Sequence, residues 1–363
     1  MADFSEVFED VTKLGHKIPK ENYLDEGKYP IIDQGQTYIA GYSNNSEGLY
    51  SDVPAIIFGD HTRIIKYVDM PCFLGADGVK LLHVKDKDND VKYLYYALCN
   101  ARIPNTGYNR HFKWLKEITI PLPPLPEQRR IAAVLDKVSE LIALRKRQLD
   151  LLDEMVKARF VEMFGNYPNN PKGWKTGIIR DVVLDVRYGS SRPAVIGGAY
   201  PYLRMNNITY GGELDLSDIK YIDIPDNELE KCTVRRGDVL FNRTNSKELV
   251  GKTCVYNKDE IMVLAGFVIR IRVNNKVLPE FLSAFLNTDF SKHTLFSMCK
   301  TAIGQANINA QEMQNIGLYL PPIRLQQDFV NFKIQVEKSK ATVQQGLDRL
   351  NLLKSALMQE YFG

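Results

Sequence analysis

The sequence predicts an α+β protein in which two mixed α/β domains are joined by two long helices that form an antiparallel intramolecular coiled coil. A proline-rich stretch occurs twice, an apolar heptad pattern follows each copy, and a segment of short strand-like and helix-like runs precedes each copy. Self-similarity of this kind indicates a chain built from two related halves. We therefore expect a pseudo-twofold internal repeat with segments 1–122, 123–165, 166–320 and 321–363.

The proline-rich stretch reads PLPPLPEQRR at 121–130 and YLPPIRLQQD at 319–328. Residues 122–165 align with 320–363 without a gap. Identical pairs include Leu122/Leu320, Pro123/Pro321, Pro124/Pro322, Gln128/Gln326, Val138/Val336, Leu149/Leu347, Leu152/Leu350 and Ala158/Ala356. Unrelated segments would agree far less often, so the two stretches are interpreted as copies.

Each proline-rich stretch is followed by apolar residues at alternating steps of four and three. They are Ile131, Leu135, Val138, Ile142, Leu149, Leu152, Val156 and Met163 in the first copy, and Phe329, Val336, Val343, Leu347, Leu350, Leu357 and Tyr361 in the second. This heptad spacing places one apolar stripe along each helix. Two helices of equal length would bury these stripes best against each other, although ordinary packing on a domain core is the alternative.

The segments outside the helices mix short apolar runs with turn residues. The runs 53–59, 117–123, 236–246 and 266–273 predict strands, and the runs 91–100 and 279–287 predict helices. The run IIFGDHT at 56–62 is similar to VLFNRTN at 239–245. The two domains are therefore expected to share a fold and to differ in the polar residues of their loops.

Composition excludes several classes of protein. The net charge of +3 is only mildly basic, so any contact with nucleic acid must come from local basic clusters. No apolar run is long enough for a transmembrane helix, and the acidic start MADFSEVFED lacks a signal-peptide core. The five cysteines are scattered without a CxxC pair, which favours reduced thiols, a cytoplasmic location and neither a zinc site nor a disulfide framework.

Catalytic motifs are not recognisable. The GKT at 251–253 has Ser246 where a phosphate-binding loop needs glycine, and the Pro-Pro pairs lack the preceding Asn or Asp of an amino-methyltransferase. No HExxH, GxSxG or GxG occurs, and the five histidines have no metal-ligand spacing. The chain is therefore predicted not to be an enzyme on its own, although a dispersed catalytic site leaves no such motif.

The polar loops have the residue types that bind DNA. Those of the first domain are Gln34, Gln36, His61, Thr62, Arg63, Asn105, Tyr108, Asn109, Arg110, His111 and Lys113. Those of the second are Ser190, Ser191, Arg192, Arg204, Asn206, Asn207, Asn242, Arg243, Thr244, Asn245, Ser246, Lys247, Gln305 and Asn307. Arginine matches the guanine edge, Asn and Gln match adenine, and Ser, Thr and Lys suit phosphates. For each loop alone, a solvated polar turn is the alternative.

The order of a variable domain, the segment PLPPLPEQRRIAAVLD at 121–136 with its long helix, a second variable domain and a second long helix resembles the specificity subunit of type I restriction–modification enzymes. The resemblance covers essentially the whole chain. It implies that each domain is a target-recognition domain reading one half of an asymmetric, bipartite, gapped DNA site. The helices would set the spacing and dock two methyltransferase subunits. The second copy departs from the first, because Arg324 and Leu325 replace Pro126 and Glu127.

The resemblance also implies the partners and cofactors of the complex. The partners are double-stranded DNA, two methyltransferase (modification) subunits and, through the complex, restriction/translocase subunits; no membrane is involved. The chain itself would hold no cofactor, whereas S-adenosylmethionine, ATP and Mg are expected in the partner subunits, which methylate adenine N6 and cleave DNA. Two alternatives of other classes remain: a self-contained methyltransferase or nuclease component, and a coiled-coil interaction protein that does not bind DNA.

Overall fold

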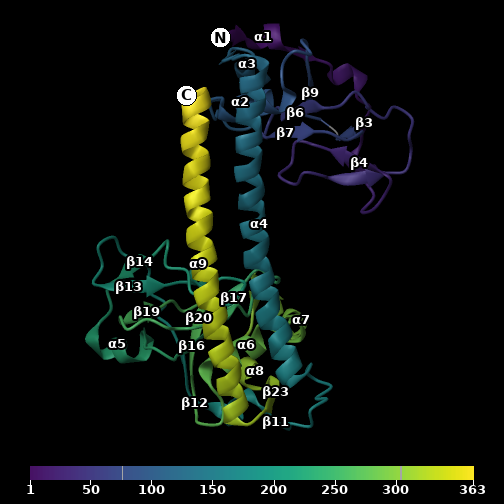
Figure 1. Cartoon of the computed structure of the whole chain (residues 1–363). Helices are drawn as coiled ribbons and strands as arrows, with labels where there is room; N and C mark the ends of the chain where they lie inside the picture. Colours follow the sequence, from purple (N-terminus) through teal and green to yellow (C-terminus); the bar gives the residue numbers. More distant parts are fainter. Residues whose placement is uncertain (76, 303–304) are drawn as a thin grey trace. The chain divides into compact units, whose positions relative to one another are not determined.

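The computed structural model describes residues 1–75, 77–302 and 305–363 (Figure 1). These residues form two compact units: unit 1 contains Met1–Lys146 and Gln344–Gly363, and unit 2 contains Arg147–Val343. Each unit therefore combines a globular part with one end of α4 (Leu125–Phe164) and one end of α9 (Ile323–Phe362).

The described part of unit 1 contains two four-stranded sheets. The first has the order β2 (Phe8–Asp10), β9 (Val79–Val84), β6 (Ala55–Gly59), β7 (Ile65–Val68), with antiparallel neighbours throughout. The second has the order β3 (Lys17–Ile18), β8 (Phe73–Gly75), β4 (Tyr29–Ile32), β5 (Gly41–Ser43). The remaining elements are β1 (Ala2–Asp3) paired with β10 (Thr119–Ile120), helices α1 (Phe4–Val7), α2 (Val91–Asn100) and α3 (Phe112–Leu115), and 3-10 turns at Thr12–Leu14 and Lys20–Asn22.

Strand β6 organises the core of unit 1. All five of its residues are buried, because successive side chains point to opposite faces of the sheet and both faces are covered. Ile56 and Phe58 pack in the cluster that contains α2 and the start of α4, whereas Ala55 and Ile57 pack in the cluster of the second sheet. The strand predicted at 53–59 and the helix predicted at 91–100 are thus confirmed, the strand beginning at Ala55.

The described part of unit 2 has a corresponding pair of sheets. The first has the order β12 (Val183–Tyr188), β20 (Val268–Val273), β16 (Val239–Asn242), β18 (Thr253–Val255), and the second β14 (Lys220–Ile222), β13 (Tyr200–Leu203), β19 (Met262–Leu264), β15 (Thr233–Val234). Smaller sheets join β11 (Lys175–Ile178) to β23 (Gly317–Leu320), and β17 (Thr244–Asn245) to β22 (Gln305–Asn307) and β21 (Lys300–Ala302). The helices are α5 (Asp226–Cys232), α6 (Pro279–Leu286), α7 (Asp289–Met298) and α8 (Ala310–Gln314), with 3-10 turns at Ile179–Val182 and Met205–Asn207.

The strand order of the two units agrees except at one edge. In both units the first sheet is antiparallel throughout, and the second contains a central parallel pair, β4 with β8 and β13 with β19. The edge strands differ, since β3 runs parallel to β8 whereas β15 runs antiparallel to β19. The mixed α/β character predicted from the sequence is therefore confirmed, and the two units differ in the pairing of one edge strand.

Within each unit, α4 and α9 run in opposite directions. In unit 2, the ring of Phe160 lies 5.2 Å from that of Phe329, and Lys340 binds Asp153. In unit 1, the guanidinium of Arg130 lies 5.8 Å from the ring of Tyr361. Strand β10 covers only Thr119–Ile120 of the strand predicted at 117–123. It ends before Pro121 because proline has no N–H for strand pairing.

The apolar stripe predicted on α4 is buried in its first half. Ile131, Leu135, Val138 and Ile142 are buried, whereas Leu149, Leu152, Val156 and Met163 are half-buried. Phe160 and Phe164, which were not predicted from the sequence, are 2% and 0% exposed and belong to the core of unit 2. A single heptad stripe cannot show this second buried face, because it arises from packing against α6 and β23.

Candidate nucleic-acid interface

In unit 1, three polar loops that are distant in sequence meet at the turn between β6 and β7. The backbone N–H of His61 donates to Gln34 Oε1 at 3.2 Å, and Thr62 Oγ1 donates to the carbonyl oxygen of Gln34 at 2.7 Å. On its other side, His61 Nδ1 lies 3.2 Å from the carbonyl oxygen of Asn109. The structure thus brings together the loops that carry most of the candidate residues of the first domain.

The turn between these strands has a strained backbone that fixes its direction. Arg63 adopts a φ of 62°, in the left-handed region that non-glycine residues rarely occupy. A Cβ at Gly59 would overlap Thr62 Oγ1, so glycine is required where the turn begins. Arg63 is further held by a 3.3 Å hydrogen bond from Nη1 to the carbonyl oxygen of Ile103. Its guanidinium therefore supports the loop that carries Tyr108.

His61 and Tyr108 form a stacked pair at the surface of unit 1. Their rings lie 4.7 Å apart with an angle of 8° between the planes, and Tyr108 is 88% exposed. A carbonyl oxygen only accepts hydrogen bonds, so the contact with Asn109 assigns the proton to His61 Nδ1. In the neutral ring, Nε2 is then an acceptor, which suits the amino group of adenine or cytosine.

The candidate residues of unit 1 divide into exposed and internal ones. Exposed are Gln36, Thr62, Asn105, Tyr108, Asn109, Arg110 and Lys113. His111 is buried, with Nδ1 3.0 Å from the carbonyl oxygen of Asp60. The amide of Gln34 is occupied on both sides, because its Nε2 donates to the carbonyl oxygen of Asp77 at 3.1 Å. Gln34 and His111 thus hold the loops in place and are not available to a base.

In unit 2, Arg243 is presented by the turn between β16 and β17. Its guanidinium lies 5.0 Å from the ring of Tyr188, within cation–π distance, and its backbone N–H donates to the carbonyl oxygen of Phe267 at 2.9 Å. Tyr188 is 39% exposed and Phe267 50% exposed. Arg243 Nε is buried without a hydrogen-bond partner among the described residues. An arginine whose guanidinium lies beside a partly exposed aromatic ring is suited to an anionic or base ligand.

Two candidates next to Arg243 are internal. Asn242 is fully buried, and its Nδ2 donates to the carbonyl oxygens of Thr244 and Phe267 at 3.0 and 3.2 Å. Thr244 is also buried and donates to Asn307 Oδ1. Asn245, Ser246, Lys247 and Asn307 are half-buried, and Gln305 is exposed. The buried amide and hydroxyl therefore hold the turn that presents Arg243.

The other two arginines among the candidates of unit 2 are paired with carboxylates. Arg192 binds Glu228 through two hydrogen bonds of 2.7 and 3.3 Å, and this contact lowers the pKa of Glu228. Arg204 Nη2 binds Asp218 Oδ2 at 2.7 Å. Asn207 is buried and donates to the carbonyl oxygen of Asp215. Ser190 is also buried, whereas Ser191 and Asn206 are exposed.

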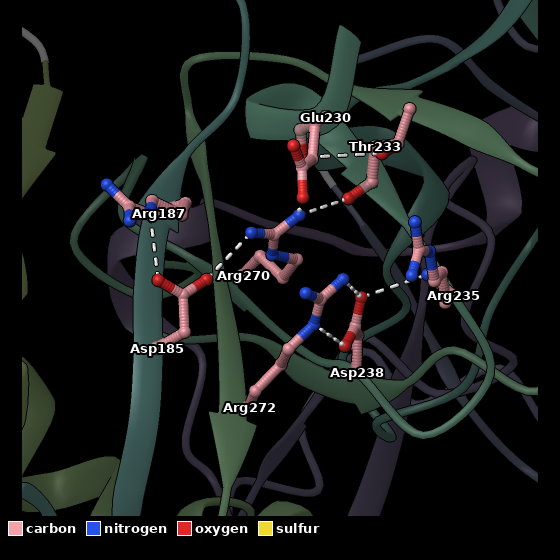
Figure 2. Close-up of polar contacts among 8 residues, drawn as sticks. All are labelled: Asp185, Arg187, Glu230, Thr233, Arg235, Asp238, Arg270 and Arg272. Carbon is pink, nitrogen blue, oxygen red and sulfur yellow. Dashed lines mark hydrogen bonds and ion pairs between the residues drawn. The ribbon is translucent and has the colours of Figure 1, made fainter.

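An arginine network in unit 2 links β20 to β12 and to the segment 230–238 (Figure 2). Arg270 on β20 is 3% exposed; its Nη2 donates to Asp185 Oδ2 at 2.7 Å, and its Nη1 donates to the carbonyl oxygen of Thr233. Arg272 donates through Nε to Asp238 Oδ1 at 2.8 Å. Burial raises the pKa of Asp185, but its hydrogen bonds and ion pairs with Arg270 and Arg187 outweigh burial and lower it. Sequence analysis assigned this strand correctly and missed the network.

The described residues also bear on phosphate and metal binding. Lys252 of the GKT sequence is buried, and its Nζ donates to the carbonyl oxygen of Met205 at 2.8 Å, so it does not face a phosphate site. Residues 1–75, 77–302 and 305–363 contain no group of three or more His, Cys, Asp or Glu that could hold a metal ion. The five cysteines are free thiols. In the same part of the chain, no helix is both long and apolar enough to cross a membrane.

Comparison with known proteins assigns the family. The chain belongs to the family of the type I restriction modification DNA specificity domain, whose family model matches residues 3–154 and 171–351. It is 25% identical over 265 residues to the EcoKI specificity subunit of Escherichia coli K12, covering 68% of this chain and 57% of that protein. It is 26% identical over 198 residues to the putative MjaX specificity subunit of Methanocaldococcus jannaschii, covering 53% and 46%. The alignments thus span about half the length of these curated relatives.

Solved structures show the same fold. The S subunit of a type I restriction–modification system from M. genitalium matches with a TM-score of 0.58 at 16% identity, covering 99% of this chain and 95% of that one. A chain solved to explain complex assembly and conformational transition of a type I R-M system matches with a TM-score of 0.56 at 18% identity and the same coverage. At this level of identity, the agreement concerns the fold alone.

Proposed function

We propose that this chain is the DNA-recognition subunit of a type I restriction–modification complex and is not catalytic on its own. Each of its two target-recognition domains reads one half of an asymmetric, bipartite, gapped site. The observation that carries this proposal is that the two units have similar sheets but different polar and aromatic residues in their loops. The strand order of the two units agrees except at one edge, but unit 1 carries His61 stacked on the exposed Tyr108, whereas unit 2 carries Arg243 with its guanidinium beside the ring of Tyr188.

The proposed reading surface of unit 1 contains the exposed candidates around His61 and Tyr108. The proposed surface of unit 2 consists of Arg243, Tyr188, Phe267 and Gln305, together with Ser191. Tyr188 and Phe267 are additions to the residues expected from the sequence. Because the two surfaces offer different donors and acceptors, the two half-sites should differ in sequence. The buried candidates, such as His111 and Asn242, support these surfaces.

The long helices are proposed to form an antiparallel coiled coil that relates the halves by a pseudo-twofold axis and sets the gap between half-sites. The opposite direction of α4 and α9 within each unit supports the coiled coil, and the shared sheet order supports the internal repeat. The proposed domain boundaries remain 1–122, 123–165, 166–320 and 321–363. A cytoplasmic location also stays a prediction.

The outer faces of the helices are proposed to dock two methyltransferase subunits, which supply S-adenosylmethionine binding. Restriction subunits using ATP and Mg would join through the complex. In unit 1, α4 exposes Leu141 and Leu144, and α9 exposes Leu352 and Leu353 at 72% and 47%. A contiguous exposed apolar patch on a helix marks an interaction surface, and these leucines are the residues proposed for such a patch.

The deciding experiment mixes the purified chain, methyltransferase subunits, S-adenosylmethionine and DNA in all combinations. Sequence-specific methylation should require both the chain and the subunits. Methyl transfer by the chain alone would instead identify a self-contained enzyme. Failure to bind DNA at any salt concentration, with the subunits present, would identify an interaction protein that does not read DNA.

A further inference from the structure

Unit 2 contains a cavity of about 270 Å³ that the reading of DNA does not use. Its walls come from α4, the loop 210–213, the end of α6, the start of α7, and α9. The floor is aromatic: Phe160 packs on Phe329, and Tyr167 packs on Phe290 and Tyr319 with ring centroids 5.1 and 5.7 Å apart. A concave site with an apolar floor and a few polar groups is typical of small-molecule binding.

The charged groups that line the cavity differ in whether they have an ionic partner. Asp153 and Glu213 share the single ammonium of Lys340, and Asp289 and Glu337 also line the cavity. Lys292, which also lines the cavity, donates to the carbonyl oxygen of Gly251 at 3.3 Å and has no ion pair with a carboxylate among the described residues. Burial and the ammonium groups of Lys252 and Lys157 lower the pKa of Lys292 to about 8. The cationic Lys292 would therefore be stabilised by an added anion.

A third feature is an unused acceptor. Asn287 lines the cavity, and its Nδ2 donates to the carbonyl oxygens of Thr253 and Ser283 at 2.7 and 2.9 Å. Its Oδ1 is buried without a hydrogen-bond partner among the described residues. A buried acceptor left unpaired costs about 1–3 kcal/mol, so a donor on a ligand would relieve this cost.

We propose that this cavity binds a small organic anion with an aromatic body and one hydrogen-bond donor. The rings of the floor take the aromatic body, the ammonium groups of Lys292 and Lys157 take the anionic group, and Asn287 Oδ1 accepts from the donor. This site goes beyond the reading of DNA. One wall is the loop 210–213, which comes shortly after the exposed candidate Asn206 in the chain, so an occupant would stabilise that loop.

The close packing of this loop on Asn287 supports the assignment. Gly212 has a φ of +86°, and a Cβ there would overlap Asn287 Nδ2. The loop therefore approaches Asn287 only because residue 212 is glycine. The contact fixes the amide in place, with both N–H groups used, and leaves the carbonyl oxygen as the group of Asn287 without a partner among the described residues.

The test uses the full-length chain without DNA, with indole-3-acetate as the probe and calorimetry as the readout. The indole N–H supplies the donor and the carboxylate supplies the anion. We expect saturable binding at one site, and binding at least about tenfold weaker for indole-3-acetamide and for 1-methylindole-3-acetate, which lack the anion and the donor respectively. Because no DNA is present, the result is independent of the proposed function.

Variants locate the probe. Lys292→Met and Lys157→Met should each weaken binding of indole-3-acetate by about tenfold while the far-ultraviolet circular dichroism spectrum stays unchanged. Lys258→Met, a change at an exposed lysine outside the cavity, should leave binding unchanged. Ala284→Trp, which fills the cavity, should abolish binding. Absence of binding, equal binding of the acid and the amide, or full binding by both lysine variants would each overturn the proposal.

Discussion

Gln326 Oε1 accepts a hydrogen bond from the backbone N–H of Leu278 at 2.8 Å, at the residue that caps α6. Gln326 is fully buried, and its Nε2 donates to the carbonyl oxygens of Pro321 and Lys276 at 2.9 and 3.1 Å. Unit 1 repeats this arrangement, since Gln128 Oε1 accepts from the backbone N–H of Asp90 at 2.9 Å. The repeated glutamine therefore ties the start of each long helix to the helix cap of its own domain.

We expect Gln326→Ala to destabilise the chain by about 1–3 kcal/mol, because it leaves a buried N–H and two carbonyl groups unpaired. Thermal unfolding followed by circular dichroism measures this change. The matched control is Gln327→Ala at the adjacent exposed position, which should change stability by less than about 0.5 kcal/mol. Equal effects of the two substitutions would show that the buried amide is not a structural tie.

The sequence showed Gln128 and Gln326 as an identical pair in the repeat, but it could not show which backbone N–H each side chain binds. Leu278 lies far from Gln326 along the chain, and a hydrogen bond between them depends on how α6 approaches α9. The mixed α/β character, the two long helices and the central strands followed from periodicity and turn residues, which are local. The ends of the edge strands did not follow from these local patterns, because the pairing of an edge strand depends on the neighbouring strand.

The candidate site was predicted less completely, for the same reason. Asn242 and Thr244 have the residue types of base readers, yet both are buried and hold the turn around Arg243. Phe267 was missed because GFVIRIRV reads as a strand with its apolar residues in the core, whereas the turn before β20 places Phe267 at the surface. Burial of a polar residue and exposure of an aromatic residue are tertiary properties.

Asp185→Asn tests the arginine network. The change removes the carboxylate partner of the buried Arg270, and we expect a loss of about 2–3 kcal/mol, below the 3–5 kcal/mol of a fully buried pair because Asp185 is partly exposed. Denaturant unfolding at pH 7 measures the loss. Asp259→Asn, whose partner Arg236 is exposed, is the control and should change stability by at most about 1 kcal/mol.

The same network predicts a pH dependence. Because the folded state lowers the pKa of Asp185, its stabilising contribution is present above the ordinary aspartate pKa and is lost as the pH falls through the lowered folded-state pKa. The stability difference between the original chain and Asp185→Asn should therefore shrink when unfolding is repeated in acid. A difference that stays constant down to pH 2 would contradict the ion-pair explanation.

Arg243→Ala should weaken recognition of one half-site by about 1–3 kcal/mol. The reason is that the guanidinium of Arg243 lies 5.0 Å from the ring of the partly exposed Tyr188 at the proposed surface of unit 2. Arg243→Lys should not restore recognition, because an ammonium lacks the planar fork of a guanidinium. Methylation rates on DNA with single changes in each half-site give the measurement. The exposed Arg236→Ala serves as the control, and unchanged rates for Arg243→Ala would remove it from the reading surface.

Tyr108→Ala should affect the other half-site, because Tyr108 and its stacked partner His61 belong to unit 1. Loss of the ring should cost about 1–3 kcal/mol of recognition, whereas Tyr108→Phe keeps the ring and should retain most of it. Since neutral His61 presents Nε2 as an acceptor, His61→Ala should reduce discrimination in favour of a base with an amino group, adenine or cytosine. Methylation of a half-site library would reveal a different position or no change if this assignment is wrong.

Leu353→Glu tests the docking of methyltransferase subunits. In the repeat, Leu353 of α9 corresponds to Met155 of α4, and the two side chains are 47% and 41% exposed. If each belongs to one docking face, Leu353→Glu should remove one of the two subunits from the complex, because a buried carboxylate without a partner is costly at an apolar contact. Met155→Glu should remove the other, and the double variant should bind neither.

Native mass spectrometry counts the subunits directly, with the neighbouring exposed Asn351→Glu as the control. Two bound subunits in the double variant would place docking elsewhere on the chain, whereas loss of both subunits from either single variant would show that the two faces bind as one cooperative site.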